Sequence, residues 1–298
     1  MENQHTVNET PAVSTTPYLR TAIIWITTLI ILAFAGKMGE YSSISLGVSS
    51  TIRHFIQAII MSGLLIPVIW YLTSRYDQSL MEHVGFQKFK PSFLWFLLGA
   101  GLILTPMFLT LTATHIFGWG TIEFNDSVAI FSTLVTGLIT VFLFEALPEE
   151  MAFRGYIFSQ IDTKHKTWIA GIISVILFAL LPITLFGIQS LIFTSEVNFG
   201  SQNTLSGSYV MTMLFFGGIV QYLRIITKTI WTGVGFHLAF VYSDRLVGVT
   251  DTDLIIIADA TNQTAPQLML LSLMGLVIIT FIIVTYRQKK KLTTSMVF

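Results

Sequence analysis

Val128 to Gly155, which reads VAIFSTLVTGLITVFLFEALPEEMAFRG, is the stretch that decides the fold. Its first part, up to Leu147, has the length of about 20 residues that an α-helix needs to cross a bilayer. Only one residue in that part, Glu145, carries a charge, and four of the last eleven residues are ionisable. The stretch therefore predicts a membrane-spanning helix that ends in a group of charged side chains.

The composition of the whole chain supports a membrane protein. Of its 298 residues, 53% are hydrophobic and only 11% are charged, against about 25% charged in soluble domains. A water-soluble globule of this composition would expose large apolar patches. The net charge is zero and no basic patch is evident, so we expect no nucleic-acid partner. The absence of cysteine excludes disulfides, thiolate metal sites and a cysteine nucleophile.

Apolar runs of spanning length recur along the chain. They predict an all-α, polytopic membrane protein with about eight transmembrane helices and with membrane lipids as its surroundings. We expect one transmembrane domain over residues 21–286, a disordered polar tail over 1–20 and a basic cytoplasmic tail over 287–298. The seventh run is short and nearly touches the sixth. The eight runs are 21–36, 55–72, 93–117, 128–147, 168–188, 209–226, 229–243 and 267–286.

Basic residues predict the orientation of these helices. With eight spans, thirteen Lys and Arg side chains lie on one side, Arg154 and Arg224 among them, and only Lys37, Arg53 and Arg245 lie on the other. Cytoplasmic segments retain Lys and Arg, so we expect both termini to be cytoplasmic in a multi-pass protein of the cell membrane.

The charged group after the fourth span is not explained by topology. An ionisable side chain at membrane depth costs about 2.5 to 3.5 kcal/mol and usually faces a cavity or a partner. We expect the span to end or kink at Pro148 and a new helix to start with Glu149 and Glu150 in its first turn. Glu150 and Arg154, four residues apart, can pair, which leaves Glu149 for chemistry. The alternative is a helix-end salt bridge without further function, and Glu145 is equally open to support or to function.

Histidine is the other chemical resource of the spans. Only His115 and His237 lie within apolar runs, and His237 is the better candidate. Its neighbours Gly233 and Gly235 permit another helix to approach closely, and an imidazole there would otherwise be buried without a partner. The alternative for His237 is an interhelical hydrogen bond without catalytic use.

The motifs resemble those of one membrane-protein family. The run EEMAFR, residues 149–154, resembles the Glu-Glu-x-x-x-Arg motif of the CPBP family, which comprises CAAX-type prenyl endopeptidases and bacteriocin-processing Abi proteins. The resemblance covers about residues 128–244. The family's Phe-x-x-x-His motif falls on residues 178–182, where Pro182 replaces the histidine. Its His-x-x-x-Asn/Asp motif falls on residues 237–241, where Val241 replaces the polar residue.

The resemblance implies an eight-helix fold and a role for each matched residue. Glu149 would activate the attacking water, Glu150 and Arg154 would position the site, and His237 would bind a metal or polarise the water. Glu149 and His237 are the metal candidates, with a divalent ion such as zinc in view. Catalytic zinc normally has three protein ligands, so a site without metal is equally open, with Glu145 as a possible substitute ligand.

The resemblance therefore implies an intramembrane endopeptidase, a hydrolase acting on a membrane-associated peptide or on a prenylated or bacteriocin-type substrate. The alternative, motivated by Pro182 and Val241, is a catalytically impaired relative that confers bacteriocin immunity or binds a peptide in the membrane. A transporter is disfavoured because the two halves of the chain show no matched pair of interrupted helices.

Overall fold

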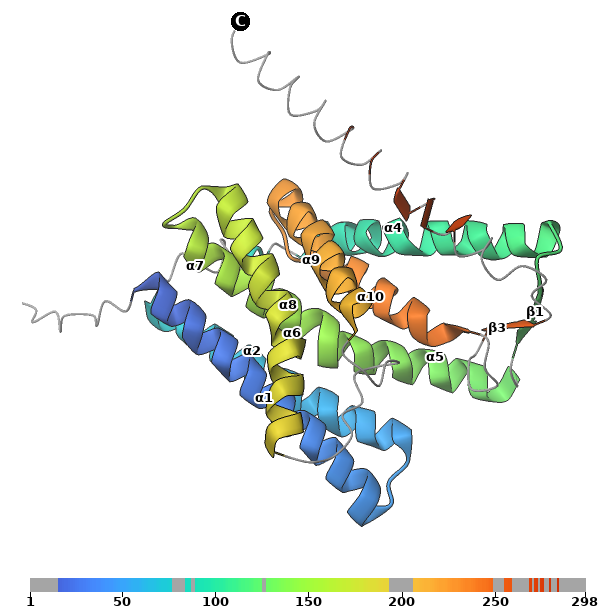
Figure 1. Cartoon of the computed structure of the whole chain (residues 1–298), viewed down its shortest axis with the longest axis horizontal. Helices are drawn as coiled ribbons and strands as arrows, with labels where there is room; N and C mark the ends of the chain where they lie inside the picture. The colour runs from blue at the N-terminus through green and yellow to red at the C-terminus, as the bar shows by residue number, and fades with distance from the viewer. Residues whose placement is uncertain are drawn as a thin grey trace, which may run out of the picture.

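A computed structural model shows that the chain is helical, apart from three short strands, wherever the structure describes it (Figure 1). The long helices coincide with the apolar runs, because a helix makes its backbone hydrogen bonds within one segment, as a membrane requires. The described residues are 16–76, 84–86, 89–124, 127–192, 206–248 and 255–258, with residues 268, 269, 271, 272, 274, 275, 279 and 283.

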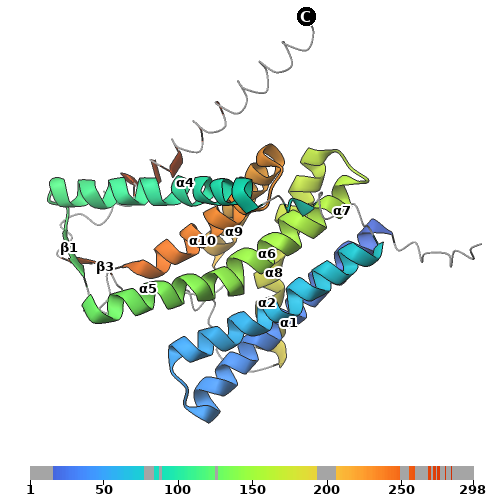
Figure 2. The ribbon, with the colours of Figure 1, turned by 180° about the vertical axis from the view of Figure 1, so that it is seen from behind.

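Helices and strands alternate along the chain only near one end of the molecule, and Figure 2 shows the arrangement from behind. The strands form a small sheet in the order β1-β3-β2, with β1 antiparallel and β2 parallel to β3. The elements are α1 (Pro17–Leu46), α2 (Ser50–Tyr76), α4 (Phe89–Ile116), β1 (Thr121–Phe124), α5 (Ser127–Val141), the π-helical η1 (Phe142–Ala146), α6 (Leu147–Glu150), the π-helical η2 (Met151–Ile157), α7 (Phe158–Asp162), α8 (Thr167–Ile192), α9 (Gly207–Thr227), α10 (Trp231–Leu246), β2 (Val247–Gly248) and β3 (Ile255–Ala258).

The prediction of an all-α, polytopic membrane protein is confirmed. Within the described residues, five helices are long and apolar enough to cross a membrane, namely α1, α2, α4, α8 and α9. The predicted fourth span lies in the helical run from α5 to α7, and the seventh lies in α10, which has 16 residues. Of the 20 residues of the predicted eighth span, 267–286, the structure describes eight. The number of eight spans therefore stays a prediction.

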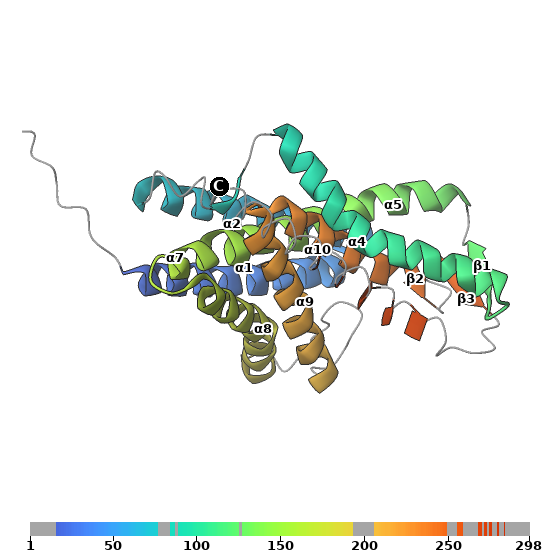
Figure 3. The same ribbon diagram turned by 90° about the horizontal axis from the view of Figure 1, so that it is seen from above.

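The start of α1 and α7 lie at one end of the molecule, and β1 and β3 lie at the other (Figure 3). At the first end, the Tyr18 hydroxyl lies 2.8 Å from Nε2 of His165. Thr229, at the start of the predicted seventh span, donates from its hydroxyl to the carbonyl of Gly85 at 3.0 Å. At the other end, β1 pairs with β3. The orientation derived from the basic residues, with both termini in the cytoplasm, stays a prediction.

Two of the thirteen bases counted for topology have a different place. Arg154 and Arg224 are 1% and 6% exposed, so neither contributes a solvated charge to a loop. The count treated them as loop residues because each lies near the end of an apolar run. The asymmetry in basic residues persists without them.

The predicted end of the span at Pro148 does not occur, although a separate α-helical segment, α6, begins beside it with Glu149 and Glu150 in its first turn. The backbone stays helical from α5 through α7, because η1 changes the hydrogen-bond register before the proline. The Leu147 N–H donates to the carbonyl of Phe142, five residues back, instead of to that of Leu143. Pro148, five residues after Leu143, has no N–H to offer, and the carbonyl of Leu143 accepts from the Ser62 hydroxyl of α2 instead.

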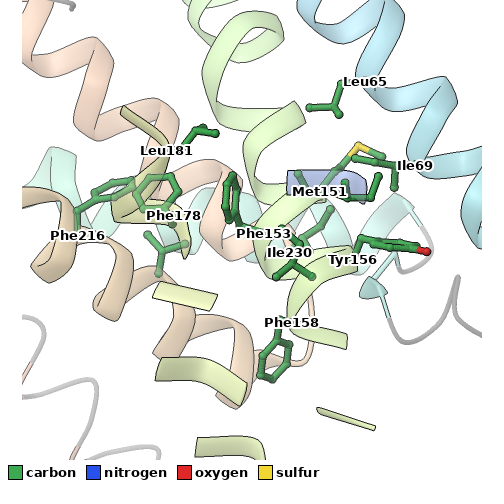
Figure 4. Packing of buried hydrophobic residues seen from close by; sticks show 14 of the residues in the cluster. Leu65, Ile69, Met151, Phe153, Tyr156, Phe158, Phe178, Leu181, Phe216 and Ile230 are labelled. Carbon is green, nitrogen blue, oxygen red and sulfur yellow. The ribbon is translucent and has the colours of Figure 1, made fainter. Parts of the chain in front are cut away.

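The second π-helical segment, η2, lies at the centre of the helix packing. All seven of its residues are buried, and it contacts α1, α2, α8 and α9. Figure 4 shows Met151, Phe153 and Tyr156 reaching from this segment toward side chains of its neighbours. The ring of Phe153 meets that of Phe178 edge to face, with centroids 5.3 Å apart. The site residues on α6 and η2 therefore stand on the best-packed part of the fold.

Two glycines bring α4 and α10 into backbone contact. A Cβ at Gly99 would overlap the carbonyl oxygen of Thr232, and a Cβ at Gly235 would overlap that of Phe96. The expectation that Gly235 permits close helix approach is confirmed. This contact fixes α10, the helix that carries His237, against α4.

Candidate active site

Glu150 is the centre of a buried polar cluster. Its Oε1 lies 3.0 Å from Nδ1 of His237 and 3.2 Å from Nη1 of Arg154. Glu150, Arg154 and His237 are 0%, 1% and 3% exposed. The structure thus brings together three of the four predicted site residues, from α6, η2 and α10. The predicted pairing of Glu150 with Arg154 is confirmed, and the partner of His237 is Glu150.

A buried charged cluster is stable only if each of its members has a partner. Two charges taken out of water lose several kcal/mol of hydration each, which their attraction offsets only with good geometry. Arg154 Nη1 makes no directed hydrogen bond among the described residues, although it lies 3.2 Å from the carboxylate. The contact of Arg154 with Glu150 is therefore an ion pair, whereas the contact of His237 with Glu150 is a hydrogen bond.

Arg154 has further contacts that hold its guanidinium in place. Its Cζ lies 4.1 Å from the centroid of the Phe178 ring, in cation–π geometry. Its Nη2 donates to the carbonyl of Gly217 on α9 at 3.4 Å. The supporting role of Phe178 was not predicted, although the residue was noted as the aromatic half of a family motif.

His237 is held by aromatic rings as well as by Glu150. The Phe216 ring meets the imidazole at 4.8 Å between centroids and at 71° between planes. Phe216 also lies 5.9 Å from the Phe178 ring and 5.1 Å from the Phe240 ring. With Nδ1 on the Glu150 carboxylate, only Nε2 of the ring is left for another partner. Phe216 was not singled out from the sequence, because nothing local distinguishes it from the other 23 phenylalanines.

Glu149 differs from Glu150 in its exposure and in its contacts. It keeps part of its surface exposed, whereas Glu150 is fully buried. It makes no hydrogen bond or ion pair with the part of the chain that the structure describes, but its charge interacts with those of His237 and Glu145. Tyr209, near the start of α9, also interacts with both Glu145 and Glu149. Glu149 is thus the carboxylate of the pair that stays accessible beside the cluster.

Unpaired atoms and a glycine mark the space around Glu150. Within the described residues, Glu150 Oε2 and Arg154 Nε are buried without a hydrogen-bond partner. A Cβ at Gly233 would lie 2.8 Å from Glu150 Oε2. Buried polar atoms without partners are uncommon and are typical of sites where water or substrate binds. Gly233 therefore makes room for the carboxylate, a more specific purpose than the close helix approach predicted for it.

The residues of the cluster do not form a three-ligand metal site. The described part of the chain contains no group of three His, Asp or Glu side chains that could hold a metal ion. Nδ1 of His237 and Oε1 of Glu150 are engaged with each other, and the motif positions at Pro182 and Val241 offer no donor. Catalytic zinc sites normally use three protein ligands, and the donor set of this cluster falls short of that.

Comparison with known proteins agrees with the geometry. Residues 131–243 match the family model described as Type II CAAX prenyl endopeptidase Rce1-like. The matched region runs from α5 into α10 and contains the whole cluster. No curated protein matches the chain. The match confirms the resemblance of this region to the CAAX prenyl endopeptidases of the CPBP family.

Proposed function

We propose, from the match of residues 131–243 to the Rce1-like family, that this protein is an intramembrane endopeptidase in which Glu149 activates the attacking water. One observation carries the proposal. His237 and Arg154 both engage Glu150, and neither forms a hydrogen bond or ion pair with Glu149 in the described structure. A carboxylate without a fixed partner, beside a histidine and an arginine, is suited to act as a general base.

The proposed reaction is the hydrolysis of one peptide bond. Glu149 takes a proton from water, and the hydroxide attacks the carbonyl carbon of the substrate to form a tetrahedral intermediate. Protonated Glu149 then gives the proton to the leaving nitrogen, the C–N bond breaks, and a carboxylate and an amine are released. Nδ1–H of His237 donates to Glu150, which leaves Nε2 of this tautomer as an acceptor that orients the attacking water.

The surroundings of the cluster indicate the class of substrate. Glu149 lies on a helix packed among α2, α10 and other apolar helices, so a substrate must reach it from the membrane or its surface. We propose a membrane-associated peptide, with prenylated and bacteriocin-type peptides as the first candidates. The absence of a three-ligand donor set among the described residues favours hydrolysis without a metal ion.

The test compares the purified wild-type protein with Glu149→Gln in lipid nanodiscs, using membrane-anchored peptides. Gln keeps the size of Glu but cannot accept the proton, so we expect cleavage to fall by about 10²- to 10⁴-fold. Glu145→Gln, one turn away on the same helix, is the matched control and should lose less. A chelator should leave the wild-type rate unchanged. Equal cleavage by wild type and Glu149→Gln would refute the assignment.

A second function is favoured by the residues that replace family polar groups. Val241 packs in an apolar cluster with Val141, Ala146, Val234 and Leu238, so its position supplies packing and no hydrogen bond. This favours a protein that binds a hydrophobic peptide and protects the cell without cleaving it. In that case, protection of cells against a bacteriocin would survive Glu149→Gln, and loss of protection in this variant would exclude the binding function.

A further inference from the structure

Arg224 is a second buried arginine beside the cluster. It lies on α9 and is 6% exposed. Its Nε donates to the main-chain carbonyl of Arg154 at 3.1 Å, and its Cζ lies 5.7 Å from the centroid of the Phe158 ring. A buried arginine loses much hydration, so its contacts must offset that loss. Besides these contacts, its charge interacts with that of Asp162 on α7.

The π-helical register of η2 explains why the Arg154 carbonyl can accept this bond. In an α-helix the N–H of Phe158 would donate to the carbonyl of Arg154, four residues back. In η2 that N–H donates to the carbonyls of Phe153 and Gly155 instead. The carbonyl of Arg154 is thus freed from its α-helical partner, and Arg224 donates to it.

Helix α9 contacts Arg154 both at its side chain and at its backbone. The Gly217 carbonyl of α9 accepts from the guanidinium of Arg154. Two turns further along α9, Arg224 holds the backbone of the same residue. The guanidinium of Arg154 in turn lies against Glu150 Oε1 at 3.2 Å. The chain of contacts from α9 to the Glu150 carboxylate is therefore continuous.

We propose that Arg224 is a positioning residue, which acts through Arg154 to hold Glu150, and with it the Glu149 backbone, in the geometry for hydrolysis. The expected effect of Arg224 on the cleavage rate rests on the proposed function. Its expected effect on the stability of η2 rests on the contacts alone. A misplacement of a catalytic group by about 1 Å costs about 10² in rate. The bond from Arg224 is the kind of support that prevents such a shift.

Three substitutions separate the hydrogen bond from the charge. Arg224→Gln puts an amide nitrogen at the place of Nε but has no charge. Arg224→Lys keeps the charge but has a methylene group at that place. Arg224→Met has similar length and neither property. If the Nε bond positions Arg154, we expect kcat of the Gln variant within about threefold of wild type, and that of the Lys and Met variants about tenfold or more lower.

Other measurements distinguish positioning from a merely structural role. KM should be unchanged in all three variants, because the bond acts on the catalytic cluster and not on the substrate. Arg75→Gln removes an exposed arginine and serves as the matched control with wild-type kcat. Rates are expressed per folded molecule, with folding followed by thermal unfolding. A ranking with Lys above Gln, or equal kcat in all variants, overturns the proposal.

Amide hydrogen exchange tests the same contact without activity. We expect amides of η2 and α7 to exchange as slowly in Arg224→Gln as in wild type, and at least about tenfold faster in Arg224→Met and Arg224→Lys. Equal exchange in all four proteins overturns the proposal whether or not cleavage is found. If wild type cleaves no peptide but the exchange order holds, the proposed function fails while the contact between α9 and η2 stands.

Discussion

At the scale of single residues, Glu149 and Glu150 share a residue type and a helix but have opposite surroundings. Glu150 has its charge matched by His237 and Arg154 inside the packing. Glu149 is accessible and has no such bond in the described structure. Adjacent positions on a helix point about 100° apart, so Glu150 faces the buried cluster and Glu149 a different direction. Under the proposed function, Glu150 would support the site and Glu149 would take part in the reaction.

The space beside Glu150 makes a prediction at this scale. We expect Gly233→Ala to lower the free energy of unfolding by about 1 to 3 kcal/mol, because the added Cβ would lie 2.8 Å from Glu150 Oε2. Cleavage should fall together with stability as the carboxylate is displaced. Thermal unfolding in detergent measures the first effect and peptide cleavage the second.

Gly218→Ala is the matched control for that substitution. A Cβ at Gly218, also within a helix, would meet no atom within 4 Å. Alanine has the higher helix propensity, so this variant should be as stable as wild type or more stable by up to about 1 kcal/mol. If Gly233→Ala behaved like Gly218→Ala, the close contact with Glu150 would have no energetic weight.

At the scale of elements, the two π-helical segments determine which groups the central helix offers to its neighbours. In each segment one carbonyl lacks its α-helical hydrogen bond, that of Leu143 in η1 and that of Arg154 in η2. Side chains of other helices, Ser62 on α2 and Arg224 on α9, donate to these carbonyls. π-bulges occur frequently at functional sites, and in this protein they flank the acidic pair.

The contact of Ser62 makes a prediction at this scale. We expect Ser62→Ala to lower the free energy of unfolding by about 1 to 3 kcal/mol, because the carbonyl of Leu143 would lose its donor. Ser74→Ala is the control, since the exposed Ser74 hydroxyl donates to a carbonyl within its own helix at 3.1 Å and should change stability by less than about 0.5 kcal/mol. Thermal unfolding of both variants checks this, and equal stability losses would contradict it.

The difference between local and tertiary information explains which elements could be predicted. The pair of Glu150 and Arg154 depends only on a spacing of four residues, and the sequence shows that spacing directly. The choice of Glu150 by His237 depends on how α10 is rotated against α6, 87 residues away in the chain. The continuity of the helix at Pro148 depends on Ser62, a donor from another helix. Neither fact has a local signal.

At the scale of the whole molecule, the hydrophobic and charge patterns were sufficient for the architecture. Apolar runs predicted the positions of the helices because burial in lipid requires an unbroken apolar segment. The orientation inferred from the positive-inside pattern stays a prediction, and the count behind it included Arg154 and Arg224, which are buried. The number of basic residues in a segment does not show which of them are buried, and for this reason two core residues were taken as loop residues.

The absence of cysteine allows a direct test of orientation. We expect a cysteine introduced as Lys164→Cys, in an exposed position beside α7, to react with a membrane-impermeant maleimide only after the cells are opened. Ser49→Cys, in the exposed turn between α1 and α2, should react in intact cells. Wild type, which has no cysteine, gives the background. The reverse pattern would place both termini outside the cell.

The contact of α4 with α10 has a consequence for the movement of these helices. Where two backbones touch at Gly99 and Gly235, neither helix can roll about its own axis without driving a carbonyl into its neighbour. We therefore expect α4 and α10 to keep their relative place, and His237 with them. Under the proposed function, a peptide would enter between other helices of the bundle. The imidazole would then stay in the same position relative to α4.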